Sequence, residues 1–256
     1  MTVLLATPSA AESQSSPPHY SASQLHCARY LESSHSEIET ETARGAVKAT
    51  SDREGVWSFR ARDTTGGVAL EAWYDSLGLR RRSGDSEVIA DTDGLIGGRY
   101  RGLLTPSGRY AELARPFVPD EVAEIADLSG AARDLLPALP PRPLRPGESW
   151  ADSTLTLTRL PDTLLARRPL AHYRLRSRLE IREAVPRGDT LPIPLHQVTE
   201  EDGDVYWSPA VGLVRRVRRI TVEATVPSGG RVRLPARSRV EQQVELTRLP
   251  SRQPCT

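Results

Sequence analysis

The stretch "AHYRLRSRLEIR", Ala171 to Arg182, alternates between two kinds of side chain. One parity carries Ala171, Tyr173, Leu175, Leu179 and Ile181, and the other carries His172, Arg174, Arg176, Arg178, Glu180 and Arg182. A period of two is that of a β-strand, because successive side chains point to opposite faces. The stretch therefore predicts a strand with one apolar and one charged face, as in an antiparallel sheet with one side in solvent.

The same alternation recurs along the chain, at 68–74, 220–226 and 240–246, and turn-forming segments such as "DTTGG" (63–67), "TPSG" (105–108) and "VPSGG" (226–230) separate the runs. One helical pattern interrupts them, "PDEVAEIADLSGAARDLLPAL" at 119–139. Ser129 and Gly130 are expected to kink or break it, and its apolar side needs a sheet to cover. We therefore expect a mainly β (α+β) fold: a large curled antiparallel sheet, or half-barrel, wrapped around one central helix, kinked or broken.

The domain boundaries follow from the same patterns. Residues 1–24 are interpreted as a signal remnant or a disordered linker, because a short apolar run precedes Ser-, Pro- and Gln-rich sequence. A single curled-sheet domain is expected over 25–249, with strand groups at 25–115 and 150–249. The helix and a proline-rich connector occupy 116–149, and 250–256 form a tail.

Charge balance argues against nucleic acid. The stretch "WSPAVGLVRRVRRI", Trp207 to Ile220, carries four arginines close together, yet the chain has 34 basic and 33 acidic residues for a net charge of +1. Proteins that neutralise many phosphates usually carry a basic surplus. We interpret these arginines as mostly the solvated face of a strand, with a bulge where the apolar phase slips between Leu213/Val217 and Ile220.

The two cysteines, Cys27 and Cys255, lie near the two ends of the expected domain. They are predicted either to form a disulfide, as in an exported protein, or to be two unrelated thiols. No apolar run approaches the length of a transmembrane helix. The expected location is periplasmic or secreted, with the true signal peptide truncated.

Catalytic motifs are lacking: the sequence has no phosphate-binding loop, dinucleotide fingerprint, zinc motif or nucleophile elbow. No catalytic, cofactor-binding or metal-binding residue is predicted, and no cofactor. The large aromatic residues are core by default. If the sheet does not close over the helix, they line an apolar cleft, and these candidates are Trp57, Trp73, Trp150, Tyr173 and Trp207.

The segments "WYDSLGLRRRS" (73–83) and "WSPAVGLVRRV" (207–217) each pair an aromatic residue with a turn and a Gly-Leu return, and "LRPGESW" (144–150) leads into "STLTLTRL" (153–160). In these features the chain resembles exported bacterial envelope proteins with the architecture of the outer-membrane lipoprotein carrier and lipid-binding lipoproteins. The resemblance spans residues 37–249. It implies a curled sheet around a helix, identifies no ligand residues, and leaves a lipid anchor unsupported because the lipobox cysteine is missing.

The sequence thus favours a monomeric, non-enzymatic protein of the cell envelope that binds an apolar or lipid-like ligand between sheet and helix. The alternative is a protein–protein interaction or assembly module of the envelope with no small-molecule ligand. A second alternative is an enzyme of unrecognised type.

Overall fold

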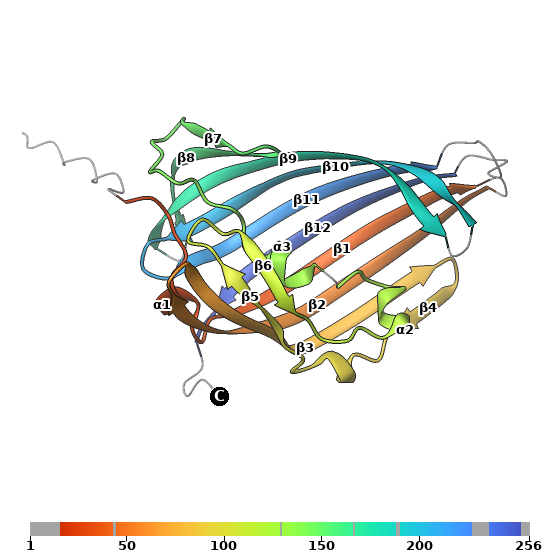
Figure 1. Ribbon diagram of the computed structural model, residues 1–256, viewed down its shortest axis with the longest axis horizontal. Helices are drawn as coiled ribbons and strands as arrows, with labels where there is room; N and C mark the ends of the chain where they lie inside the picture. Colours follow the sequence, from red (N-terminus) through yellow and green to blue (C-terminus); the bar gives the residue numbers. More distant parts are fainter. Residues whose placement is uncertain are drawn as a thin grey trace, which may run out of the picture.

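The computed structural model describes residues 16–42, 45–128, 130–165, 167–187, 190–226 and 236–251. These residues form one antiparallel sheet of 12 strands with a few short helices (Figure 1). The strands are β1 (Arg29–Thr42), β2 (Gly45–Thr64), β3 (Gly67–Ser83), β4 (Ser86–Ile89), β5 (Tyr100–Leu104), β6 (Tyr110–Ala114), β7 (Ser149–Ala151), β8 (Leu155–Leu165), β9 (Arg168–Arg187), β10 (Thr190–Ser208), β11 (Gly212–Val226) and β12 (Ala236–Leu249). The helical turns are α1 (Ala22–Leu25), η1 (Asp93–Leu95), α2 (Asp120–Ala123) and α3 (Ala131–Leu135).

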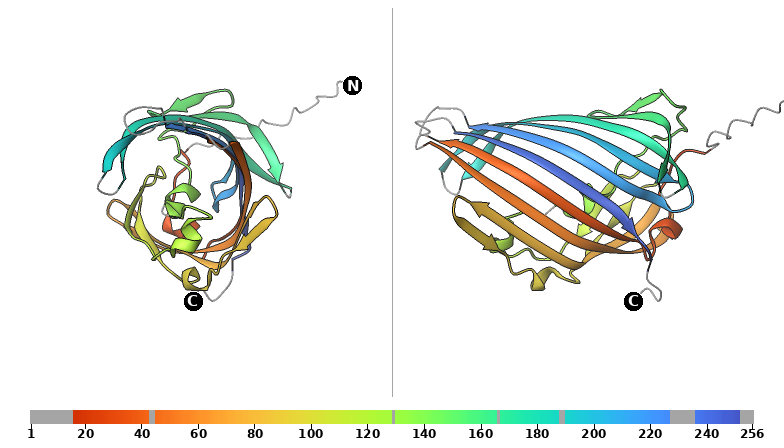
Figure 2. Two further views of the ribbon diagram at one scale, coloured as in Figure 1. Left: turned by 90° about the vertical axis from the view of Figure 1, so that its right-hand side faces the viewer. Right: turned by 180° about the vertical axis from the view of Figure 1, so that it is seen from behind.

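The first and last strands of the chain pair with each other in the middle of the sheet. The order is β6-β5-β3-β2-β1-β12-β11-β10-β9-β8-β7, with β4 paired to β3 beside this path. The sheet does not close, since β6 and β7 lie at opposite ends of that order. Seen along its length, it curls into an incomplete barrel with α2 and α3 inside the curl (Figure 2). The expectation of a mainly β fold built on a large antiparallel sheet is confirmed.

The opening stretch forms the middle of β9, and its alternation matches the two faces of the sheet. Ala171, Tyr173 and Leu175 are buried on the inner, concave face. His172 and Arg174 point outward, where each contacts the carboxylate of Asp204, at 2.8 and 3.3 Å. Strands of up to 20 residues result, far longer than the common strand of about five or six residues.

The expected single central helix is not confirmed. The segment contains two short helices, α2 of four residues and α3 of five. Its backbone carbonyls accept hydrogen bonds from sheet side chains instead: Arg81 donates to the Glu124 carbonyl at 2.6 Å and Tyr100 to the Leu128 carbonyl at 3.3 Å. Gly130, next to Ser129, precedes α3. Tertiary hydrogen bonds therefore satisfy carbonyls that a continuous helix would satisfy internally.

The packed core fills the half of the concave face nearest α1. Trp57 is fully buried there and packs against Tyr74, with ring centroids 3.8 Å apart and ring planes tilted by 37°. The α2–α3 segment contributes Val122, Leu128 and Leu135, all buried. This segment therefore lies across the inner face and covers part of the core.

Several sequence predictions concern segments that lie outside the described residues. Cys27 directly follows α1 and donates its backbone N–H to the Phe59 carbonyl at 3.0 Å. Cys255 lies outside the described residues, so the Cys27–Cys255 disulfide stays a prediction. Residues 1–15 of the segment 1–24, which is expected to be a signal remnant or a disordered linker, also lie outside them, as do most of the 250–256 tail and most of the "VPSGG" turn.

Candidate functional site

Farther along the long strands, two paired rows on the inner face contain no charged residue. Pairing places Leu179, Thr199, Val222, Val240, Ile38 and Ala49 side by side in one row. The next row consists of Ile181, Gln197, Ala224, Ser238, Thr40 and Val47. We call these two rows the open inner face.

The open inner face is largely uncovered. Leu179 is 44% exposed and Val47 55%, and most of the other members are half-buried. The α2–α3 segment accepts hydrogen bonds from Ser51, Arg81 and Arg216, which lie closer to the packed core. Apolar side chains thus remain accessible on a concave surface.

The outer face of the same strands has the opposite character. The outward row between the two uncharged rows contains Glu180, Val198, Glu223, Arg239, Glu39 and Lys48. Its members form ion pairs, Arg239 with Glu223 at 3.3 Å and Lys48 with Glu39 at 3.4 Å. At this level of the strands, charge is therefore confined to the outer side of the sheet, while the two inner rows are free of it.

A buried charged cluster separates the open inner face from the packed core. Glu201 lies 3.0 Å from Arg216 and 2.7 Å from Arg218. Arg216 also donates to the Asp134 carbonyl at 2.7 Å, which ties β11 to α3. On β2, Arg53 pairs with Glu32 at 2.6 Å. These inward charges were missed from the sequence, which predicted that the arginines near Val217 mostly face solvent.

A bulge in β11 causes the unexpected inward orientation of Arg216 and Arg218. Tyr206 pairs with Arg215 and Trp207 with Leu213, so Val214 is the extra residue on β11. The bulge predicted from the phase slip exists, but it lies before Arg215 rather than after it. Arg216 and Arg218 are thereby turned inward and Val217 outward, while Arg215 and Arg219 remain on the outer side.

The protonation of the cluster reflects its burial. Burial alone would raise the pKa of Glu201, but the guanidinium groups of Arg216 and Arg218 outweigh it and hold that pKa below its usual value. Burial and the neighbouring charge of Arg218 lower the pKa of Arg216 to about 10. Glu201 and Arg216 therefore both stay charged near neutral pH.

A cavity of about 120 Å³ lies between α3 and the sheet beside this cluster. It is lined by Arg53, Arg216 and Arg218 together with Ile220, Gln242, Val244, Leu246, Glu32, Asp127, Ala131, Asp134 and Leu135. The space between helix and sheet is thus small and partly charged, in contrast to the wholly apolar cleft expected there.

The five predicted cleft residues lie in three different environments. Trp57, Tyr173 and Trp207 are buried in the core, and Trp150 is partly buried against it. Trp73 is on the other side of the sheet from Tyr74, where its indole donates to Asp75 at 2.9 Å under the guanidinium of Arg99, 3.5 Å from the ring centroid. None of the five lines the cavity beside α3. Their role in a ligand cleft stays a prediction.

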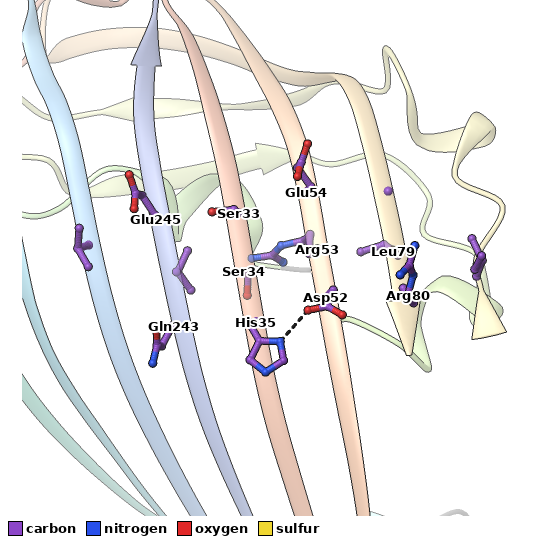
Figure 3. Close-up of a pocket in the computed structure, with 14 residues that line it drawn as sticks. Ser33, Ser34, His35, Asp52, Arg53, Glu54, Leu79, Arg80, Gln243 and Glu245 are labelled. Atoms are coloured by element: carbon purple, nitrogen blue, oxygen red, sulfur yellow. Dashed lines mark hydrogen bonds and ion pairs between the residues drawn. The ribbon is translucent and has the colours of Figure 1, made fainter. Parts of the chain in front are cut away.

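The outer face carries a groove of about 610 Å³ around His35 (Figure 3). The imidazole Nδ1 lies 2.7 Å from Asp52, its pairing neighbour on β2, and Nε2 lies 3.9 Å from Glu37. The ring is therefore held between two carboxylates, and Ser33, which also lines the groove, does not complete a nucleophile–base pair with it. Among the described residues, no cluster of three or more histidine, cysteine or acidic side chains is arranged to hold a metal ion.

Comparison with known proteins finds a solved structure with a similar fold. The chain is similar to a structure that reports lipid–protein interactions in lipovitellin, with a TM-score of 0.51 and 12% identity over 87% of this chain. It spans only 25% of the lipovitellin chain. At this identity the similarity shows a shared fold alone.

A putative outer membrane lipoprotein-sorting protein domain from Vibrio parahaemolyticus is also matched, at 10% identity over 88% of this chain and 84% of that one, but its TM-score of 0.17 supports no conclusion. No protein-family model matches the sequence. No curated protein matches it either. Within the part of the chain that the structure describes, no helix is long and apolar enough to cross a membrane.

Proposed function

We propose that this protein is a non-enzymatic protein of the bacterial cell envelope, periplasmic or secreted, that binds a lipid-like apolar ligand on the open inner face. The observation that carries the proposal is the pair of uncharged rows, half-exposed on a concave surface, behind an outer row that is mostly charged. A solvated face with no ligand would not need to exclude charge from both rows. Contiguous exposed apolar surface on a soluble protein usually marks a binding site.

The energetics favour an apolar occupant. Covering a Leu, Ile or Val side chain contributes roughly 1.5–3 kcal/mol when its burial becomes complete. Leu179, Val222, Val240 and Ile38 lie along one row, so an extended acyl chain could contact all of them at once. The interspersed Thr199 and Gln197 can reach polar groups on such a ligand. The fold is similar to that of lipovitellin, a protein whose structure reports lipid–protein interactions, and this supports the proposal of a lipid-like ligand.

Replacing Val222 by lysine tests the proposal. The half-buried position tolerates the longer side chain, but an ammonium group on this face must lose water when an acyl chain covers it. We expect the V222K variant to bind tritiated oleyl alcohol, a neutral long-chain probe, at least about tenfold more weakly than wild type, equal to about 1.4 kcal/mol.

The adjacent residue supplies the matched control. Thr221 faces outward between Glu200 and Glu241, so the T221K variant adds the same charge on the other side of the strand. It should bind oleyl alcohol like wild type. Equal weakening by both variants, or no binding by wild type together with no lipid in an organic extract of the purified protein, would contradict the proposal and favour an assembly module.

A further inference from the structure

Two of the arginines that line the cavity beside α3 have a buried donor without an acceptor. The Nε atoms of Arg53 and Arg216 have no hydrogen-bond partner among the described residues, although both are shielded from solvent. Both arginines line the same cavity of about 120 Å³. Because buried polar groups in folded proteins are nearly always paired, these two N–H groups indicate that an acceptor belongs there.

The buried charged groups around the cavity include more guanidinium groups than carboxylates. Three guanidinium groups, those of Arg53, Arg216 and Arg218, face two buried carboxylates, those of Glu32 and Glu201. Asp127 and Asp134 also line the cavity, but both residues are exposed, and the Asp134 carboxylate lies 3.5 Å from Arg133. Solvent screens these two exposed acids more strongly than the buried groups.

The cavity adjoins the open inner face. Ile220 and Gln242 line it, and each lies two residues along its strand from a member of the uncharged row, Val222 and Val240 respectively. The cavity therefore borders the middle of that row on its core side, next to a ligand chain that lies on the open inner face. A volume of about 120 Å³ exceeds what one water needs, roughly 10–15 Å³, and has room for a small oxyanion.

We propose that the ligand is an anionic amphiphile whose carboxylate or phosphate accepts hydrogen bonds from the unpaired Nε–H groups of Arg53 and Arg216 in this cavity, while its acyl chain lies along the open inner face. The inference rests on the proposed function and specifies the ligand class of the same site. Guanidinium groups suit it, since they bind carboxylate and phosphate with charge-assisted hydrogen bonds.

The test compares three probes with the same oleoyl-type chain on the delipidated full-length chain: oleate, oleoyl lysophosphatidate and neutral oleyl alcohol. We expect at least one anionic probe to bind about tenfold or more tightly than oleyl alcohol. The one that binds more tightly identifies the head group. The R216Q variant should lose this preference and keep its affinity for oleyl alcohol, whereas the R219Q variant, which removes an equal charge from the outer face, should keep both.

A second measurement uses unmodified protein, in case R216Q does not fold. The buried Nε–H signals of Arg53 and Arg216 in ¹⁵N NMR spectra should shift when the tighter anionic probe is added, and not with oleyl alcohol. Equal affinity for all three probes, with unmoved signals, overturns the head-group inference and leaves the proposed function standing. Failure of every probe to bind instead contradicts the proposed function itself.

Discussion

Replacing Glu201 by glutamine is expected to lower the free energy of unfolding by about 3–5 kcal/mol, the usual result of removing one partner from a buried ion pair. Glu201 is the acid of two buried contacts, with Arg216 and Arg218. Without it, two guanidinium groups of like charge remain close together on the inner face. Denaturation with urea at neutral pH measures the change.

Glutamine at position 200 is the control. Glu200 is exposed on the outer face and pairs with Arg178, so the E200Q variant should lose no more than about 1 kcal/mol, as for surface ion pairs. An E201Q variant as stable as E200Q would show that the inward cluster does not hold β11 against α3.

The effect of E201Q should also depend on pH. Because the folded-state pKa of Glu201 is lowered, the carboxylate contributes stability that is fully present above its unfolded-state pKa, near 4.5, and is lost as the pH falls through the folded-state pKa. The stability difference between wild type and E201Q is therefore expected to be constant near neutral pH and to shrink in acid.

Replacing Trp57 by alanine should destabilise the protein by about 3–5 kcal/mol, as large-to-small changes in packed cores do. Trp57 is fully buried and packs against Tyr74, and its ring centroid lies 5.5 Å from that of Tyr100. Its indole also donates to Glu32 at 2.8 Å. The same urea titration measures this loss.

Two further variants separate the contribution of the aromatic volume of Trp57 from that of its indole hydrogen bond. The W57F variant keeps most of the aromatic volume and removes the indole donor, while Glu32 retains its contact with Arg53, so its cost should be only about 1–2 kcal/mol. The W150A variant, at a partly buried position, should cost less than W57A. If W57A cost no more than W150A, the packed core would not be centred on Trp57.

Strand periodicity was enough to predict the sheet. In β9, β11 and β12 the alternation of apolar and charged residues is long, and each inward residue meets inward residues on both neighbouring strands. The spacing of Val122, Ile125 and Leu128 predicted a helix, but the same spacing fits a series of turns equally well, so it does not distinguish the two. Carbonyls of this segment instead accept hydrogen bonds from Arg81, Tyr100 and Arg216. These residues are distant in the sequence, so no local pattern reveals the contacts.

The candidate site was only partly predictable. The uncharged rows were visible as the apolar parity of single strands, but the absence of charge across them depends on strand order and register. The inward turn of Arg216 and Arg218 depends on one extra residue, Val214, whose position the sequence did not fix. Assigning the tryptophans to a cleft relied on their size, which equally suits the core that Trp57 and Trp207 occupy.

The most direct test is photo-crosslinking with an oleyl alcohol analogue that carries a diazirine on its chain, followed by mass-spectrometric mapping of the labelled residues. The account predicts labelling at Ile38, Leu179, Val222 and Val240, suppressed by excess unlabelled oleyl alcohol. Competable labelling confined to the outer-face groove around His35, or labelling that oleyl alcohol does not suppress, would contradict it.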